Sequence, residues 1–172
     1  MTWDKNVDYD IARESLLKLL KEARIKVRAG NKKARARLTI ILILLTQLRN
    51  GARLGESYEA VYKFAETKAR EVYVRLEKQK RYEERLMVLP EDVTPEDLSY
   101  VVRVNRDSVY TFARRILGIN THSLRYAFVT RLSKMGYPPN IIAKITGHKN
   151  LNHLITYTQA KKGEEILRAL SL

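Results

Sequence analysis

Five residues spread along the chain are of types that can bind or attack a phosphodiester. They are Arg53, His122, Arg125, His148 and Tyr157. A guanidinium can hold two non-bridging phosphate oxygens through its planar fork, and it stabilises the extra charge that builds up when phosphorus is attacked. A tyrosine hydroxyl can act as nucleophile and keep a covalent phosphoryl link. Because its pKa is about 10, it needs a local base to accept its proton, or nearby cations that lower the pKa, to attack at neutral pH. The set therefore indicates attack on a phosphodiester.

Taken singly, each of these residues also has an ordinary structural interpretation. Arg53 and Glu56 are one helical turn apart, so Glu56 can orient the guanidinium in a site or form an exposed ion pair at a helix start. His122 and Arg125 share a helix face, which also suits a packing histidine beside a surface arginine. Tyr157 is one of 10 tyrosines, most of which we expect at packing or surface positions. Order and spacing of the whole set carry more information than any member.

The charge balance predicts a polyanionic partner. The 172 residues include 33 Lys and Arg against 19 Asp and Glu, a net charge of +14, and such an excess favours nucleic acid. We assign contacts with this polyanion to one basic run. The run comprises Arg24, Lys26, Arg28, Lys32, Lys33, Arg35 and Arg37. The alternatives are a solvated basic surface without a ligand and attraction to a membrane.

The composition also excludes several classes of protein. The longest unbroken apolar run, Ile40–Leu45, is far shorter than the ~20 residues that span a bilayer, and acidic residues interrupt the N-terminal region where a signal peptide needs an apolar core. The absence of cysteine removes disulfides, thiolate metal sites and cysteine nucleophiles. We expect a soluble, intracellular protein with no membrane partner.

Hydrophobic periodicity predicts a mostly helical chain. Apolar residues at three- and four-residue intervals indicate an amphipathic helix over 9–29, and the stretch 32–49 is apolar almost all round, as in a central buried helix. The period changes to that of a strand over 72–75, and a second short strand over 86–89 follows a polar turn over 77–84. Further helices are predicted over 95–104, 106–117, 122–135, 139–146, 152–159 and 163–170.

Capping residues support this order of elements. Thr94 offers an N-cap, Pro95 suits the first helical position, and Asp97 falls in the first turn, where an acid suits the helix dipole. The expected fold class is mainly α with a small antiparallel β-sheet (α+β), in a single domain over 1–172.

The ordered motifs resemble those of the tyrosine recombinase, or phage integrase, family. That family carries an arginine box Arg-x-[Gly/Ser]-Glu, matched by Arg53-Leu54-Gly55-Glu56, and a His-x-x-Arg box, matched by His122-Ser123-Leu124-Arg125. A Gly-His pair, matched by Gly147-His148, and a tyrosine nine residues later (157 − 148), matched by Tyr157, complete the pattern. Four boxes in order are far more specific than any one of them. The resemblance extends from about Leu38 to Tyr157 and implies the catalytic-domain fold of tyrosine recombinases.

The resemblance implies a role for each residue of the set. Tyr157 would attack the scissile phosphate and form a 3′-phosphotyrosyl link, while Arg53 and Arg125 would bind the non-bridging oxygens. His122 and His148 would tune proton positions and hydrogen-bond the phosphate. The chain would then be a metal-independent site-specific recombinase or integrase that acts on double-stranded DNA, in DNA recombination and DNA integration. It would need no cofactor and no metal, and it would be a cytoplasmic, nucleoid-associated protein of a cell or a virus-infected host.

Family members also use a lysine in a β-hairpin turn as general acid for the leaving 5′ oxygen. Both Lys78 and Lys80 lie in the turn expected here. Counting from the first strand favours Lys78, whereas counting back from Arg85 favours Lys80. The two counts leave the choice open, with a slight preference for Lys78.

The family usually places a helical core-binding domain ahead of the catalytic one. Too few residues precede the central helix for that domain, so we expect a catalytic domain alone, either excised or naturally abbreviated, and self-association to a tetramer on DNA in the full-length protein. The residues of the motifs are similar to those of integrases of archaeal viruses and plasmids. The alternatives are a type IB topoisomerase, which resembles recombinases in its catalytic residues, and a non-catalytic basic DNA-binding module.

Overall fold

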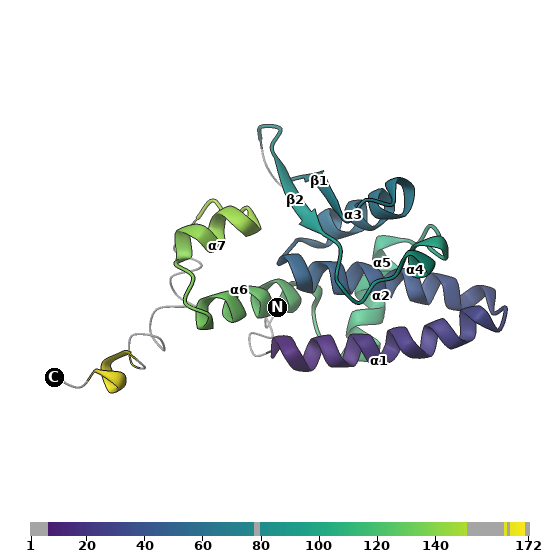
Figure 1. The fold of residues 1–172 in the computed structure, drawn as a ribbon, viewed down its shortest axis with the longest axis horizontal. Helices are drawn as coiled ribbons and strands as arrows, with labels where there is room; N and C mark the ends of the chain where they lie inside the picture. Colours follow the sequence, from purple (N-terminus) through teal and green to yellow (C-terminus); the bar gives the residue numbers. More distant parts are fainter. Residues whose placement is uncertain (1–6, 78–79, 151–163, 165, 171–172) are drawn as a thin grey trace.

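A computed structural model describes residues 7–77, 80–150, 164 and 166–170 of the chain (Figure 1). Its elements, in chain order, are α1 (Tyr9–Arg28), α2 (Lys32–Asn50), α3 (Leu54–Thr67), β1 (Glu71–Arg75), β2 (Glu84–Val88), α4 (Pro95–Ser99), α5 (Arg106–Phe112), a π-helical turn η1 (Ala113–Leu117), α6 (Thr121–Lys134) and α7 (Pro139–Thr146). Strands β1 and β2 pair antiparallel. The predicted class, mainly α with a small antiparallel sheet, is confirmed.

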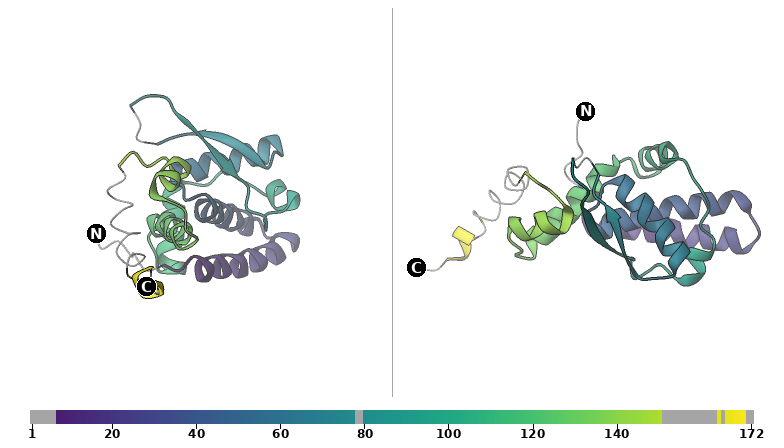
Figure 2. Two further views of the ribbon diagram at one scale, coloured as in Figure 1. Left: turned by 60° about the vertical axis from the view of Figure 1, so that its left-hand side comes forward. Right: turned by 90° about the horizontal axis from the view of Figure 1, so that it is seen from above.

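Helix α2 runs through the centre of the molecule, and its apolar sequence explains the packing of its neighbours. Every residue from Leu38 to Leu48 is buried. Helices α1, α3 and α6 contact α2 from different sides (Figures 1 and 2), because a helix that is apolar all round needs cover all round. Helix α1 covers it with one stripe that includes Leu16, Leu20 and Val27. The predicted central buried helix is confirmed.

Gly51 ends α2 and lets α6 approach it. Its φ is +57°, in the left-handed region, and a Cβ at this position would stand 2.2 Å from Cδ1 of Phe128 in α6. Only glycine combines this backbone conformation with so close a contact. The chain therefore turns within a few residues from α2 to Arg53 while α6 lies alongside.

The side chain of Asn50 attaches the hairpin to the end of α2 at Val88. Strand pairing runs from Glu71 opposite Val88 to Arg75 opposite Glu84. The Asn50 amide nitrogen donates to the carbonyl of Val88 at 2.9 Å, and the Asn50 side-chain oxygen accepts from the amide of Val88 at 2.8 Å. Beyond this anchor the hairpin projects from the helical body (Figures 1 and 2).

The helix predicted over 95–104 is wrong in its length, because α4 ends at Ser99. The backbone beyond it is held by other elements instead of by helical hydrogen bonds. The amide of Val102 donates to Oγ1 of Thr39, and the amide of Val104 donates to the hydroxyl of Tyr62, both at 3.0 Å. Branched side chains in this stretch also favour an extended backbone over a helix. The predicted start is correct, since Thr94 caps α4 in a capping box.

The remaining helices compare as follows with their predicted ranges. The helix predicted over 106–117 is present as α5, but its last turn is the π-helix η1, closed by Gly118 at a φ of +67°. Helices α6 and α7 agree with their predicted ranges within one residue. The range 152–159 lies outside the described residues, and residues 166–169 are helical. Within the described part of the chain, no helix is long and apolar enough to cross a membrane.

Candidate active site

Arg125 is the centre of a buried cationic cluster. It lies on α6, and 2% of its surface is exposed. Nη1 donates to the carbonyl of Gly51 at 2.9 Å and to that of Thr146 at 3.0 Å, while Nη2 lies 3.1 Å from Nε2 and 3.2 Å from Nδ1 of His148. Both carbonyls stand at helix C-termini, where the helix dipole favours a cation. One guanidinium thus joins the ends of α2 and α7 to α6.

The surroundings of Arg125 disfavour its own charge. Burial lowers the pKa of Arg125 to about 9, the positive charges of Arg53 and Arg85 act in the same direction, and the Glu56 carboxylate opposes the shift. An anion bound beside such a cation stabilises its charged form. The site is therefore suited to receive a negatively charged group.

Arg53 is the N-cap residue of α3, and Glu56 holds it in place. Its Nη1 lies 3.3 Å from Oε2 of Glu56, and its backbone amide donates to Oε1 of Glu56 at 3.3 Å. Glu56 is fully buried and also accepts from the amide of Glu77 at 3.2 Å. The Arg53 side chain remains 18% exposed, so its outer nitrogens can reach a ligand. The contact predicted between Arg53 and Glu56 is present, and its carboxylate is buried.

His148 follows the end of α7 and points its ring at Arg125. Gly147, with a φ of +75°, ends the helix, and a Cβ there would stand 2.5 Å from Cδ2 of Leu76. The Thr146 hydroxyl lies 2.5 Å from Nδ1 of His148. The ring is half-buried between these groups. The turn after α7 thus positions His148 by backbone geometry and by two side chains.

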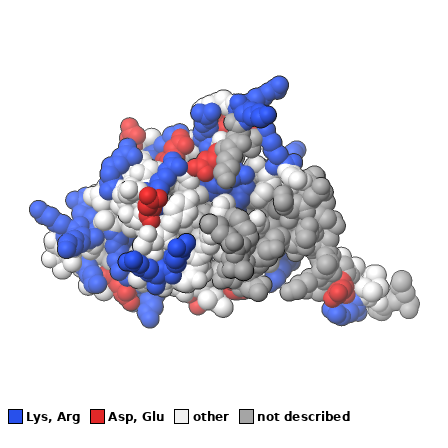
Figure 3. Space-filling view, turned by 180° about the vertical axis from the view of Figure 1, so that it is seen from behind, with Lys and Arg blue, Asp and Glu red and all other residues white. Residues whose placement is uncertain are grey.

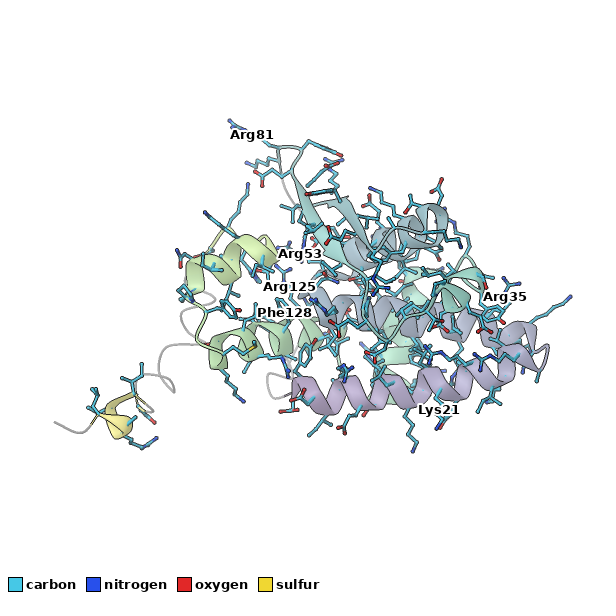
Figure 4. All side chains as sticks on the ribbon, viewed as in Figure 1. Lys21, Arg35, Arg53, Arg81, Arg125 and Phe128 are labelled. Atoms are coloured by element: carbon cyan, nitrogen blue, oxygen red, sulfur yellow. The ribbon has the colours of Figure 1, made fainter. Side chains whose placement is uncertain are left out.

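His122 lies in the first turn of α6, and Asn120 caps that helix. The backbone amide of His122 donates to Oδ1 of Asn120 at 3.1 Å, and the residue is half-buried. His122 and Arg125 share one face of α6. Figure 4 shows Arg53 and Arg125 next to each other, between α7 and the base of the hairpin.

A third arginine, Arg85, belongs to the cluster and was not predicted from the sequence. It lies on β2, is 6% exposed, and donates from Nη2 to the carbonyl of Asn50 at 2.5 Å. Its Nη1 lies 3.4 Å from the carbonyl of Thr146 and 3.5 Å from Oε1 of Glu56. Alternation along β2 carried a signal for it, because Arg85 and Met87 point to the same, buried face. The strand predicted over 86–89 began one residue too late to include it.

Two of the predicted catalytic residues, Tyr157 and Lys78, lie outside the described residues. Lys80 is described and exposed in the turn of the hairpin. Arg81, beside it, stands at the tip of the hairpin, well away from Arg53 and Arg125 (Figure 4). The choice between Lys78 and Lys80 as general acid stays a prediction.

Arginines of the basic run predicted to bind DNA make contacts within the protein. Arg24 donates to both carboxylate oxygens of Asp97, at 2.8 and 2.6 Å, and these bonds hold the pKa of Asp97 below its usual range although burial raises it. Arg28 forms a two-bond pair with Glu96 at 3.0 Å. These pairs fasten α4 to α1. DNA binding by the run stays a prediction.

Of the other members of the run, Lys26 lies in the last turn of α1, and the rest lie in the first two turns of α2. Arg35 donates to the carbonyl of Tyr100 at 3.1 Å, and the Arg37 guanidinium carbon lies 5.2 Å from the ring centre of Phe112. Lys26, Lys32 and Lys33 are exposed. On the face seen in Figure 3, basic side chains gather at the end of the molecule with this turn and at the projecting tip, with acidic side chains among them.

A cleft of about 740 Å³ adjoins the cluster between β2 and α7. Arg85, Phe128 and His148 are among its lining residues, together with Arg49 and Lys149. Of the clustered arginines Arg53, Arg85 and Arg125, it is Arg85 that lines this cleft.

The geometry defines a buried cluster of converging cations, and comparison with known proteins places the chain in a family. Residues 99–164 match the model of the Phage integrase family. A protein of Acidianus two-tailed virus named "Putative integrase ORF241" is 38% identical over 176 residues, covering 99% of this chain and 69% of that protein. A similarly named integrase of Sputnik virophage is 31% identical, covering 95% of this chain and 88% of that protein.

Among solved structures, the XerH site-specific recombinase bound to its difH substrate has the same fold. Its TM-score with this chain is 0.57 at 16% identity, and the match covers 97% of this chain and 55% of the recombinase chain. The chain belongs to the phage integrase family of tyrosine recombinases, which are DNA breaking and rejoining enzymes. The predicted resemblance to this family, including its viral integrases, is confirmed.

Proposed function

We propose that this chain is the catalytic domain of a site-specific DNA recombinase that cleaves and rejoins DNA through a covalent 3′-phosphotyrosyl intermediate. The observation that carries the proposal is the convergence of Arg53, Arg125 and His148. They come from the start of α3, from α6 and from the end of α7, and they are linked through Glu56, Arg85 and the carbonyl of Thr146. Cations gathered from separate elements suit a single phosphate with developing charge.

The cluster would bind the scissile phosphate through Arg53 and Arg125. The Arg53 side chain is 18% exposed, and Arg125 stands beside it with its pKa lowered. Arg53 and Arg85 both pair with the one carboxylate of Glu56, and the charge of this carboxylate also acts on the Arg125 guanidinium. The excess positive charge would be compensated by the phosphate and most strongly by its transition state, which carries additional negative charge on the non-bridging oxygens.

The chemical step would be an exchange of one phosphoester for another. The hydroxyl oxygen of Tyr157 attacks phosphorus, the bond from phosphorus to the 5′ oxygen breaks, and a histidine of the site, His122 or His148, accepts the phenol proton. A hairpin lysine, Lys78 or Lys80, donates a proton to the leaving 5′ oxygen. Rejoining reverses the step, because a 5′ hydroxyl attacks the phosphotyrosine and the phenol leaves.

The substrate would be double-stranded DNA, attracted by the net charge of +14. Strand exchange needs two duplexes and one active protomer for each cut strand, so we propose a tetramer on DNA in the full-length protein. Tyr157 belongs to the residues that follow α7, and it can serve the site of its own protomer or that of a neighbour.

A suicide oligonucleotide tests the proposal. A nick just beyond the scissile phosphate makes the downstream fragment short, so that after cleavage this fragment, with its new 5′ hydroxyl, diffuses away. The protein then stays linked to the 3′ phosphate of the upstream strand. We expect an adduct that survives denaturation, with its phosphorus on Tyr157 in a digested peptide. Tyr157→Phe should form none while binding DNA with nearly unchanged affinity, because the hydroxyl adds no cationic contact. An adduct formed by Tyr157→Phe, or its absence from the native chain, would refute the mechanism. Strand exchange between two labelled duplexes, as opposed to relaxation of supercoils alone, separates a recombinase from a topoisomerase.

A further inference from the structure

Arg85 is a buried arginine for which the proposed chemistry has no direct use. It reaches acceptors on three other elements: the carbonyl of Asn50 at the end of α2, the carbonyl of Thr146 at the end of α7, and the carboxylate of Glu56 on α3. Burial lowers its pKa, against the attraction of Glu56. An arginine is a costly choice for a buried strand position that an apolar residue could fill.

Each acceptor of Arg85 is also connected to a residue of the candidate active site. Glu56 pairs with Arg53 at 3.3 Å, and the carbonyl of Thr146 accepts from Arg125 at 3.0 Å. Asn50 precedes Gly51, whose carbonyl also accepts from Arg125, at 2.9 Å. Arg85 is thus one contact removed from both arginines that would hold the phosphate.

We infer that Arg85 is a positioning residue of this active site: it shares Glu56 with Arg53 and fixes the two helix ends that hold Arg125. The inference rests on the proposed function, since it specifies how the phosphate-binding arginines are held. Every guanidinium nitrogen of Arg85 already has an acceptor within the protein, because Nε, Nη1 and Nη2 all donate to protein oxygens.

The sharing of Glu56 has an electrostatic consequence for Arg53. With Arg85 present, the carboxylate divides its charge between two guanidinium groups, at 3.3 and 3.5 Å. Without Arg85, Arg53 would be the one guanidinium group paired with this buried carboxylate, among the contacts described. The Arg53 side chain would be drawn toward Glu56, and the carboxylate would compensate more of its positive charge. A phosphate would then find a weaker cation at the position of Arg53.

The test uses the full chain, the suicide oligonucleotide and three variants. For Arg85→Met we expect single-turnover cleavage at saturating DNA to fall at least about 10-fold, with DNA affinity from fluorescence anisotropy unchanged within about threefold, because phosphate contacts of exposed residues dominate binding. Adding Glu56→Gln to Arg85→Met removes the excess carboxylate charge, and we expect this double variant to cleave at least about threefold faster than Arg85→Met alone.

The double variant separates positioning from stability. If Arg85 only stabilised the fold, removing a second buried charge would leave the rate equal or lower, and that result would overturn the inference. Arg85→Lys covers the case in which Arg85→Met does not fold. Its ammonium keeps the charge but cannot match the planar fork over three acceptors, so we again expect a loss of at least about 10-fold.

Arg13→Met serves as the matched control. Arg13 is a half-buried arginine on α1 paired with Asp92 at 2.7 Å, outside the cluster, and its loss should leave cleavage within about threefold of the native rate. Cleavage within that limit by both Arg85→Met and Arg85→Lys would refute the inference about Arg85. Absence of an adduct with the native chain would instead refute the proposed function.

Discussion

Arg85 and Arg125 donate to the same carbonyl oxygen, that of Thr146, at 3.4 and 3.0 Å. One comes from a strand and the other from a helix, and the acceptor is the last residue of α7. The helix that precedes His148 is therefore held at its C-terminus by two buried guanidinium groups, which its dipole favours. The contacts that position α7 and His148 are therefore the same ones that hold the charges of Arg85 and Arg125 at this site.

Replacement of Arg125 by lysine should abolish most of the activity. A single ammonium cannot contact the carbonyls of Gly51 and Thr146 and also face His148 and a phosphate. We expect single-turnover cleavage to fall about 10²- to 10³-fold. Arg131→Lys, in the same helix but paired with Asp10, is the matched control and should stay near the native rate. Equal rates for the two variants would contradict a role for Arg125 in phosphate binding.

Cleavage should decline in alkaline solution as Arg125 loses its proton. Its pKa of about 9 in the free protein means that the cation is fully present below that pH and is lost as the pH rises through it. Bound phosphate favours the charged form, so the pKa in the complex should be higher. The alkaline limb should therefore lie near pH 9 for kcat/KM and at higher pH for kcat. Ionisation of the tyrosine nucleophile would act in the opposite direction. Identical limbs in the two profiles would contradict this assignment.

The identity of the general acid can be read from leaving-group chemistry. If Lys78 donates the proton, Lys78→Ala should slow cleavage of ordinary DNA by about 10²-fold or more. A 5′-bridging phosphorothiolate should restore its rate, because a thiolate leaves without a proton. Lys80→Ala is the parallel variant. Rescue confined to Lys80→Ala would assign the role to Lys80.

Cleavage should survive an excess of EDTA. In the proposed mechanism guanidinium groups stabilise the phosphate charge, a role that divalent ions fill in other nucleases. Adduct formation with and without the chelator measures this directly. A rate that depends strictly on added Mg²⁺ would point to a different chemistry.

Gly51→Ala should destabilise the protein more than Gly118→Ala, although both glycines have positive φ values, +57° and +67°. A Cβ at Gly118 meets nothing within 4 Å, whereas at Gly51 it would meet the ring of Phe128 at 2.2 Å. We expect losses of about 3 kcal/mol at Gly51 and about 1 kcal/mol at Gly118, from overpacking added to backbone strain. Urea unfolding measures both. Equal losses would show that the Phe128 ring moves aside freely.

The amino-acid sequence alone was enough to determine the local elements and the order of the motifs. The apolar run of α2 required cover on every side, and Thr94 with Asp97 set the start of α4. Helix α7 runs from Pro139 to Thr146 as predicted, because proline and glycine bound it. These features depend on neighbours a few residues away, and periodicity and capping report such neighbours directly.

Tertiary structure alone decided which charged groups are buried and what they bind. The residues next to Arg85 in the sequence do not predict its contacts with Asn50, Thr146 and Glu56. The residues next to Arg24 likewise do not predict its bonds to Asp97. The end of α4 at Ser99 likewise depends on Thr39 and Tyr62, which lie far from it in the chain. A charged side chain or a backbone amide that is removed from water must form a hydrogen bond or an ion pair within the protein. Only the packing of distant elements determines which partner is close enough.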